Sequence, residues 1–394
     1  MIEKSEIIES SEYLIDVSGK ISSIYNSYLG IESCSKENTI MNEDLCFFDI
    51  ETSGLSSEKS RIYLISYLIF KDGVWTLRQL LSQSSQDESN LIKGFFSDIA
   101  KKRLLVHYNG DSFDIPFIVK RALKNQIDSK SFEAMESLDL YKVVKRHKSL
   151  FKSENLKLVN LEKIFGYMRD DTMSGKELIK VYHDFEKLSS LPLKSMALEH
   201  SKELLLLHNH DDVVALPYLG NFAAFLKLKG YINAYFEGPA KSIDISQNKD
   251  FLAINLKIDY DLPFPLTLED TKRGLSLVLD DKLISLSIRI FKAEYKHFFE
   301  DYKNYYYLPE EDYAIYKSLG EYVDKSRRQR AKKENCYIKK AGRFLPASSS
   351  TNLPTFRENY KSFDCIELDS VLAHEEVLKD YLKSQIKDLI DKPL

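Results

Sequence analysis

The sequence predicts an α/β fold in which helices flank a mixed β-sheet, followed by a smaller, β-rich α+β domain. Three β-rich runs lie close together within residues 46–81, and long amphipathic helical patterns follow them. After Gly230 short alternating runs, which are typical of strands, replace the helical pattern. A chain of 394 residues is long enough for two domains. We place them at residues 41–230 and 240–394, after an N-terminal extension of residues 1–40.

Composition and charge exclude several classes of protein. The formal net charge of −4 argues against a protein that coats nucleic acid by bulk charge, but not against an enzyme with a local basic patch. The four cysteines are scattered without a Cys-x-x-Cys pair, so neither a zinc knuckle nor a disulfide framework is expected. The acidic N-terminus lacks a signal-peptide pattern, and no apolar run is long enough to cross a membrane. We therefore expect a cytoplasmic protein with no membrane partner.

The run at residues 46–55 places two acids inside a predicted buried strand. It starts apolar and ends at the turn signal Ser53-Gly54. Because alternate side chains of a strand share a face, Asp49 and Glu51 should project side by side. Two such carboxylates repel each other in a low-dielectric setting unless a cation compensates them, and Mg²⁺ takes oxygen ligands of this kind. The alternative is a strand end with two solvated acids.

Two further strands and a helix should follow. The runs at residues 61–70 and 74–81 flank an Asp-Gly dipeptide and predict a β-hairpin. Residues 88–101 carry apolar side chains at helical spacing. Residues 103–107 indicate a short buried strand next to these elements.

A third candidate acid follows that short strand. An Asn-Gly loop leads to Ser112, which is placed to cap a helix whose first turn contains Asp114. Asp114 is either a helix-terminal acid favoured by the helix dipole or a metal ligand. We expect Asp111 to be solvated and Asp139 to cap the next helix.

A strongly apolar helical stretch, which extends to about residue 229, carries the last candidates. His208 and Asp212 are one turn apart and share a face. Metal-assisted hydrolysis needs a carboxylate that anchors the ion beside a group that accepts a proton from water. The alternative is a core histidine with a salt-bridged aspartate. His210 and Asp211 are expected on the surface.

Three motifs, in this order, resemble those of the DEDD 3′–5′ exonucleases, which have a ribonuclease H-like fold. Residues 49–54 match Asp-x-Glu-Thr-x-Gly, and residues 109–117 match Asn-x-x-x-Phe-Asp-Ile-Pro-Phe. Residues 208–212 give His-x-x-x-Asp, with tyrosine-type spacing and histidine in the place of tyrosine, and their surroundings resemble the bacterial YprB-like branch. The resemblance covers about residues 44–228 and implies a ribonuclease H-like mixed sheet.

The resemblance further implies a metal-dependent 3′–5′ exonuclease that hydrolyses DNA or RNA with two Mg²⁺ or Mn²⁺ ions per site. His208 would orient or deprotonate the attacking water, and His107 is the reserve, because the departure in the third motif leaves the general base open. The implied metal ligands are Asp49, Glu51, Asp114 and Asp212. The implied contacts with nucleic acid are Thr52, Gly54, Leu55, His107, Asn109 and Phe113.

The C-terminal half carries no catalytic motif that we recognise. A basic stretch at residues 325–333 lies near several tyrosines. Cations attract phosphates and aromatic faces stack bases, so Arg327, Arg328 and Arg330 are candidate contacts with nucleic acid. The alternative is a solvated charged turn beside a tyrosine-containing β core. Strands are expected at residues 251–259, 274–279 and 282–291, a turn at Asp280-Asp281, and helices at residues 313–323 and 370–391.

Two alternatives to an exonuclease stay open. The first is a nuclease-like fold that binds nucleic acid without cutting it. The second is a structure-specific endonuclease that uses the same residues. The sequence favours neither DNA over RNA nor single over double strands.

Overall fold

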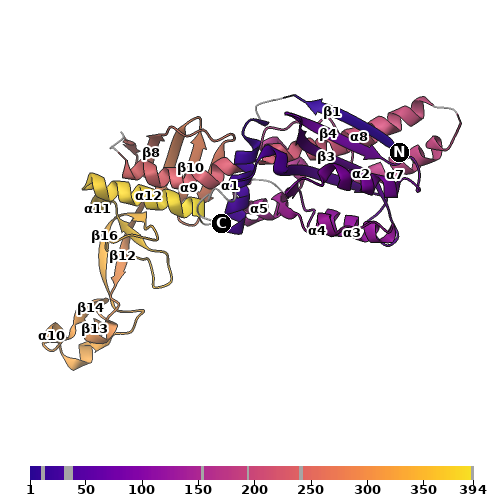
Figure 1. The fold of residues 1–394 in the computed structure, drawn as a ribbon. Coiled ribbons are helices and arrows are strands. Elements are labelled where there is room, and N and C mark those ends of the chain that lie inside the picture. The colour runs from indigo at the N-terminus through magenta and orange to yellow at the C-terminus, as the bar shows by residue number, and fades with distance from the viewer. Residues whose placement is uncertain (10–13, 31–38, 152–154, 193–194, 239–242, 392–394) are drawn as a thin grey trace. The chain divides into compact units, whose positions relative to one another are not determined.

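The computed structural model contains two compact units, residues 1–226 and 227–394 (Figure 1). The residues that it describes are 1–9, 14–30, 39–151, 155–192, 195–238 and 243–391. The expected start of the second domain, residue 240, lies outside them. None of the described helices is long and apolar enough to cross a membrane.

The first unit is built on a six-stranded sheet in the order β1-β4-β3-β2-β5-β6. The pairs β1–β4, β4–β3 and β3–β2 are antiparallel, whereas β2–β5 and β5–β6 are parallel. The expected mixed sheet is therefore confirmed. The strands are β1 Ile2–Ile8, β2 Leu45–Thr52, β3 Ile62–Lys71, β4 Val74–Leu81, β5 Leu104–His107 and β6 Glu136–Asp139.

The hairpin between β3 and β4 forms as its turn sequence predicts. The first eight residues of β3 are all buried, which suits their side chains, because all except Ser66 are aliphatic or aromatic. Lys71 pairs with Val74, so Asp72 and Gly73 alone make the connection. Their φ angles are 52° and 86°, and a two-residue turn with both φ positive matches the right-handed twist of the strands.

Helices cover both faces of this sheet. On one face Phe48 of β2 packs in a buried cluster with Phe95 of α2 and Phe117 of α3. On the other face Tyr63 of β3 joins residues of α7 and α8, and its ring stacks on Tyr182 at 4.0 Å between centroids. The helices of this unit are α1 Val17–Leu29, α2 Glu88–Ile99, α3 Asp114–Lys124, α4 Lys130–Glu133, α5 Leu140–Arg146, α6 Leu158–Ile164, α7 Gly175–Ser189 and α8 Met196–Leu219, with 3-10 turns η3 Asn42–Asp44 and η4 Lys148–Leu150.

Two local features of this unit differ from expectation. β1 is a strand that the sequence analysis did not anticipate, and it pairs with β4 along its whole length, from Ile2 opposite Leu81 onwards. Ser112 does not cap α3, because the cap position is Phe113 and no side chain bonds there. The turn is closed instead by the backbone, since the N–H of Ile115 donates to the carbonyl of Gly110 at 2.9 Å.

The second unit consists of antiparallel sheets and a few helices. Buried and exposed residues alternate along β8, β10 and β11, which confirms the expected strands. The turn between β10 and β11 is shifted by one residue, because Asp281 and Lys282 have the positive φ angles. The sheets are β7-β8-β11-β10-β9, β12-β16-β17 and β14-β13-β15. The strands are β7 Ile243–Gln247, β8 Phe251–Lys257, β9 Leu266–Asp270, β10 Leu275–Asp280, β11 Leu283–Arg289, β12 Phe291–Phe298, β13 Tyr305–Leu308, β14 Tyr313–Tyr316, β15 Gln329–Arg330, β16 Tyr337–Pro346 and β17 Cys365–Glu367.

The helix expected at residues 313–323 is wrong. Tyr313–Tyr316 form β14, which pairs with the tyrosine-rich β13, because tyrosine and isoleucine favour a pleated, half-buried surface. Only Lys317–Gly320, α10, is helical there. The C-terminal helix is confirmed as α12. The remaining helices are α9 Phe222–Glu237, α11 Leu368–Leu372 and α12 Glu375–Asp391, with 3-10 turns η5 Tyr302–Asn304 and η6 Lys325–Arg327.

Candidate metal centre

β2 presents its two acids to α8, as the period of two requires. Phe48 and Ile50 point into the cluster under α2 and α3, so the intervening side chains take the opposite face. There Asp49 Oδ2 accepts a hydrogen bond from Asn209 Nδ2 at 2.6 Å. Glu51 Oε1 lies 3.5 Å from His208 Nε2. Both acids of the first motif therefore meet residues some 160 positions later in the chain.

α8 contributes a histidine and an acid from consecutive turns. His208 Nε2 lies 3.3 Å from Asp212 Oδ2, one turn further along the helix. Glu51, His208 and Asp212 each offer a ligand atom within 4.8 Å of the others. The expected shared face of His208 and Asp212 is thus present, and it is directed at β2.

Asp114 completes the group from the first residue of α3. Its side chain is buried, with 6% of the residue exposed. Burial raises the pKa of Asp114 to about 6, although His107 acts in the opposite direction. Asp114 also acts on its neighbours, because its charge raises the pKa values of both Asp49 and Glu51.

The electrostatics link Asp49 to the other three acids. The pKa of Asp49 is raised well above its usual range, first by burial and then by Asp114, Asp212 and Glu51. Burial likewise raises the pKa of Glu51 to about 8, although His208 lowers it. Asp49, Glu51 and Asp114, whose pKa values are all raised, need added positive charge if they are to ionise together. Hard divalent cations such as Mg²⁺ and Mn²⁺ fit this donor set. We call Asp49, Glu51, Asp114 and Asp212 the acid cluster.

Asn209 supports the acid cluster from within α8. The residue is fully buried, and its Nδ2 is used by Asp49. Its Oδ1 has no hydrogen-bond partner among the described residues. A buried amide oxygen beside four carboxylates adds one more hard donor atom to the region and is consistent with a bound cation or water.

The loop between α6 and α7 adds two residues that the sequence analysis did not single out. Asp171 Oδ2 lies 2.6 Å from His208 Nδ1, so it holds the imidazole with Nε2 toward Glu51 and Asp212. Arg169 Nη2 lies 2.5 Å from Asp212 Oδ1. Burial lowers the pKa of His208, but Asp212, Glu51 and Asp171 outweigh it and raise the pKa above its usual value.

His107 is committed to the loop that precedes α3. Its Nδ1 accepts from the backbone N–H of Gly110 at 3.0 Å, and its Nε2 lies 2.8 Å from the Ser137 hydroxyl. Asp139 caps α5 as expected, because it accepts from the N–H of Tyr141 at 3.0 Å. Asp139 also accepts from the N–H of Asn109 at 2.8 Å, which fixes the loop at a residue with φ of 64°.

Three surface assignments need correction. Asp111 is not simply solvated, because Lys142 lies 2.5 Å and the Ser137 hydroxyl 2.6 Å from its carboxylate. Asp211 is buried, not on the surface, since the Tyr167 hydroxyl donates to it at 2.7 Å and the N–H groups of residues 170 and 171 also bond to it. His210 is only partly exposed and lies 3.0 Å from Asp211. The contacts that Asp111 and Asp211 make with Lys142, Ser137, Tyr167 and the N–H groups of residues 170 and 171 cross 26 to 44 residues of chain, beyond the reach of a local pattern.

The residues expected to contact nucleic acid are spread over both units. Near the acid cluster, Thr52 donates to the carbonyl of Gly54 at 3.0 Å, Leu55 is 87% exposed, and the Phe113 ring packs on Phe117. In the second unit, Arg327 pairs with Glu310 and Glu311. Arg328 donates to the carbonyl of Gly320 and lies over the Tyr306 ring, while Arg330 is exposed in β15.

Comparison with known families bears on the first unit. The sequence profile of the RNase H superfamily matches residues 46–223. This segment is therefore similar to the RNase H superfamily, and we call it the RNase H domain after this similarity. It contains every strand of the sheet except β1 and part of β2, and all four acids of the cluster. A search of curated proteins found no match.

Solved structures resemble the chain only distantly. The family B DNA polymerase of the archaeon Pyrobaculum calidifontis is 16% identical with a TM-score of 0.36, over 66% of this chain and 35% of the polymerase. Escherichia coli exonuclease I with a 5cy-dA13 oligonucleotide is 14% identical with a TM-score of 0.26, over 60% of this chain and 54% of the exonuclease. This chain thus spans about a third to a half of those proteins. With identities and TM-scores this low, the similarities do not bear on its activity.

Proposed function

We propose that this protein is a metal-dependent nuclease that hydrolyses phosphodiester bonds of DNA or RNA from the 3′ end. The observation that carries the proposal is that Glu51, His208 and Asp212 each offer a ligand atom within 4.8 Å of the others. Asp49 bonds to the adjacent Asn209, and the charge of Asp114 acts on both Asp49 and Glu51. Largely buried carboxylates that raise one another's pKa values are costly unless a cation compensates them. They are well suited to hold divalent ions against a phosphate.

The acid cluster would hold two Mg²⁺ or Mn²⁺ ions. When bound, a pair of such ions activates water and stabilises the attacking and leaving oxygens of an in-line displacement. Asn209 would keep Asp49 in the rotamer seen here. Glu51 and Asp212 both lie close to Nε2 of His208, so the histidine would lie directly beside the metal ligands.

His208 is the group that we assign to the proton. Asp171 fixes the ring through Nδ1, so Nε2 is the nitrogen that faces the reacting centre. A histidine in this position can orient the attacking water and accept or return its proton. His107 is less suited, because both of its ring nitrogens already serve the loop at residues 107–111 and β6.

The loop after β2 offers a place for a terminal nucleotide. Gly54 has no side chain, and a Cβ there would lie 2.6 Å from the Ser60 hydroxyl. The adjacent Leu55 is strongly exposed and can pack against a base. We propose that Thr52, Gly54, Leu55, His107, Asn109 and Phe113 surround the scissile end, and that Arg327, Arg328 and Arg330 belong to a second contact region.

The test compares wild type with Asp49→Ala and Asp212→Asn on 5′-labelled and 3′-labelled DNA and RNA in Mn²⁺. Removal of a metal ligand should lower the cleavage rate by at least ~10²-fold while the fold is retained. Asp170→Asn, an exposed acid near the cluster, is the matched control and should cleave normally.

The pattern of products separates the alternatives. Stepwise shortening from the 3′ end supports the exonuclease, whereas internal fragments would indicate an endonuclease. If the wild-type protein binds the oligonucleotides but does not shorten them, it is a nucleic-acid-binding protein without nuclease activity. If Asp49→Ala digests substrate as fast as wild type, the acid cluster is not the active site.

A further inference from the structure

The part of the second unit built around β12, β13 and β16 is basic although the chain is acidic. Residues 292–361 contain fifteen Lys and Arg but ten Asp and Glu, a formal charge of +5, whereas the whole chain has −4. Local positive charge of this kind attracts polyanions in spite of the sign of the whole molecule.

The β12–β16 ribbon sets like charges directly against each other. Its register opposes Lys292 to Arg343 and Lys296 to Lys339. Because alternate residues share a face, all four lie on one side together with Glu294, and we call this side the basic face. Like charges directly opposite on paired strands are destabilising. An anion bound along the basic face would remove this repulsion.

The cations of the basic face are free to exchange partners. Lys339 pairs with Asp312 and Arg343 with Asp369, but these lysine and arginine side chains are 30% and 40% exposed, and such pairs contribute little. Lys292, Lys296 and Lys333 form no ion pair within the part of the chain that the structure describes. Phosphate groups can therefore engage them without breaking a buried network.

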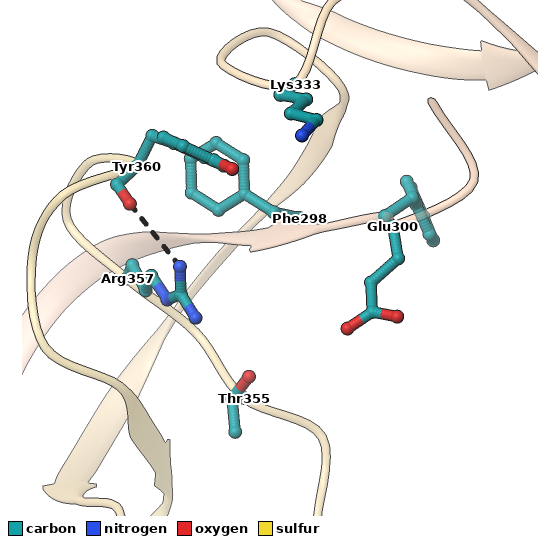
Figure 2. A pocket seen from close by; sticks show the side chains of 7 residues that line it. Phe298, Glu300, Lys333, Thr355, Arg357 and Tyr360 are labelled. Carbon is teal, nitrogen blue, oxygen red and sulfur yellow. Dashed lines mark hydrogen bonds between the residues drawn. The ribbon is translucent and has the colours of Figure 1, made fainter. Parts of the chain in front are cut away.

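The basic face ends at a cavity of about 360 Å³ with aromatic walls (Figure 2). Phe298 follows Lys296 on the same face of β12, and its ring meets Tyr360 edge-on at 5.7 Å between centroids. The Lys333 ammonium points toward these rings in Figure 2. A flat apolar group can lie against the rings while a phosphate contacts the ammonium.

Arg357 is held rigidly at the edge of this cavity. Its Nε and Nη2 donate to Asp364 at 2.6 and 2.9 Å, and its Nη1 donates to the carbonyl of Tyr360 at 3.3 Å. A guanidinium has five N–H groups, so two have no partner among the described residues. Glu300 lines another wall of the cavity and can accept hydrogen bonds from ring N–H or amino groups of a base.

We infer that the second unit binds single-stranded nucleic acid, with one unstacked base in the cavity of Phe298, Lys333, Arg357 and Tyr360 and the adjoining phosphates along the basic face. From Lys292 to Phe298 the strand extends about 20 Å, enough for several nucleotides. Single strands are the favoured ligand because a base inside a duplex cannot reach an aromatic cavity. The inference rests on the proposed function and deepens it, because it names the part of the second unit that holds the same substrate.

The experiment measures binding of the intact chain to fluorescein-labelled 20-nucleotide single-stranded DNA and RNA, and to the matching duplexes, by fluorescence anisotropy in EDTA. Lys333→Glu should weaken single-strand binding at least tenfold and flatten the dependence of log affinity on log salt by about one unit. Tyr360→Leu should weaken it at least fivefold through lost stacking. Lys257→Glu, an exposed lysine on β8, makes the same charge change elsewhere and should bind like wild type.

Several results would overturn this inference. The first is that Lys333→Glu and Tyr360→Leu both bind single strands as tightly as wild type does. The second is that the wild-type protein binds no oligonucleotide at all, a result that would point to a protein ligand for the basic face. Duplexes bound as tightly as single strands would remove the cavity from the interface. Because EDTA prevents metal-dependent cutting, this assay measures binding alone, and its outcome does not depend on whether the acid cluster cuts. A failure of the nuclease proposal is thus distinguished from a failure of this one. Lys333 is a surface residue, so its variant tests binding even if Tyr360→Leu unfolds.

Discussion

Arg169 joins a fully buried glutamate to the acid cluster. Its guanidinium bonds to both oxygens of Glu162, at 2.7 and 3.0 Å, and also reaches Asp212. Glu162 has no exposed surface, and Arg169 has 8% of its side chain exposed. A buried ion pair of this geometry contributes modest stability by itself, but removing one partner leaves an uncompensated charge.

Arg169→Met should therefore lower the free energy of unfolding of the first unit by about 3–5 kcal/mol, because it leaves the carboxylate of Glu162 buried without a cationic partner. The free energy of unfolding, from denaturant titration, is the measurement. The double variant Glu162→Gln/Arg169→Met should recover part of the loss, since a neutral amide costs less to bury than an unpaired carboxylate. An Arg169→Met protein as stable as wild type would show that solvent already satisfies Glu162.

Asp171 is a positioning residue for His208. Asp171→Asn should keep the fold and lower the cleavage rate by about tenfold or more, because loss of an outer carboxylate partner loosens the ring and its tautomer. Steady-state kinetics in Mn²⁺ should show the loss in kcat with KM little changed. The control is Asp170→Asn, which alters the neighbouring acid without touching His208. Equal rates for the two variants would remove Asp171 from the mechanism.

At the scale of elements, the β3–β4 turn gives a sharp test of backbone conformation. A Cβ on Gly73 would meet nothing within 4 Å, so only its φ of 86° opposes a side chain. Gly73→Ala should then cost about 1–2 kcal/mol of unfolding free energy. Gly175 at the start of α7 is equally open but has no positive φ, so Gly175→Ala should be neutral or slightly stabilising. Equal effects in thermal unfolding would contradict the conformational argument.

Local periodicity in the sequence predicted many of the strands and helices and the central residues of the site. A period of two placed Asp49 and Glu51 on one face of β2, and a spacing of four placed His208 and Asp212 on one face of α8. The Asp-Gly dipeptide fixed the β3–β4 hairpin because few residues adopt positive φ in succession. Each of these inferences needed only neighbours within one turn or one hairpin.

The residues that were missed depend on contacts distant in sequence. Arg169 meets Asp212 across 43 residues, and β1 meets β4 across more than 60. No pattern within either segment specifies its partner, because packing of helices and register of strands decide it. Asp211 was placed on the surface for the same reason, since its burial depends on Tyr167 in another helix connection. The false helix at residues 313–316 was an error of interpretation, because Tyr313, Ile315 and Tyr316 favour a strand and pair with β13.

At the scale of the whole molecule, opposite local charges occur in the two units. The RNase H domain contains the acid cluster, whereas residues 292–361 carry a formal charge of +5. The proposed substrate, a nucleic acid bound with divalent ions, would compensate both. The net charge of −4 hides this division, so composition alone excluded bulk binding without revealing the local surface.

Divalent ions should raise the thermal midpoint of the first unit and leave the second unmoved. Ligand that binds only the folded state stabilises it by about 2.7 kcal/mol at a hundredfold excess over its Kd. Calorimetry of the intact chain with MnCl₂, MgCl₂ or EDTA is the measurement, and two units allow two transitions. Asp49→Ala should abolish the shift, and in EDTA it should melt no lower than wild type, because it removes one of four repelling carboxylates. Asp170→Asn should keep the full shift; an Mn²⁺ shift that survives in Asp49→Ala would place the ion elsewhere.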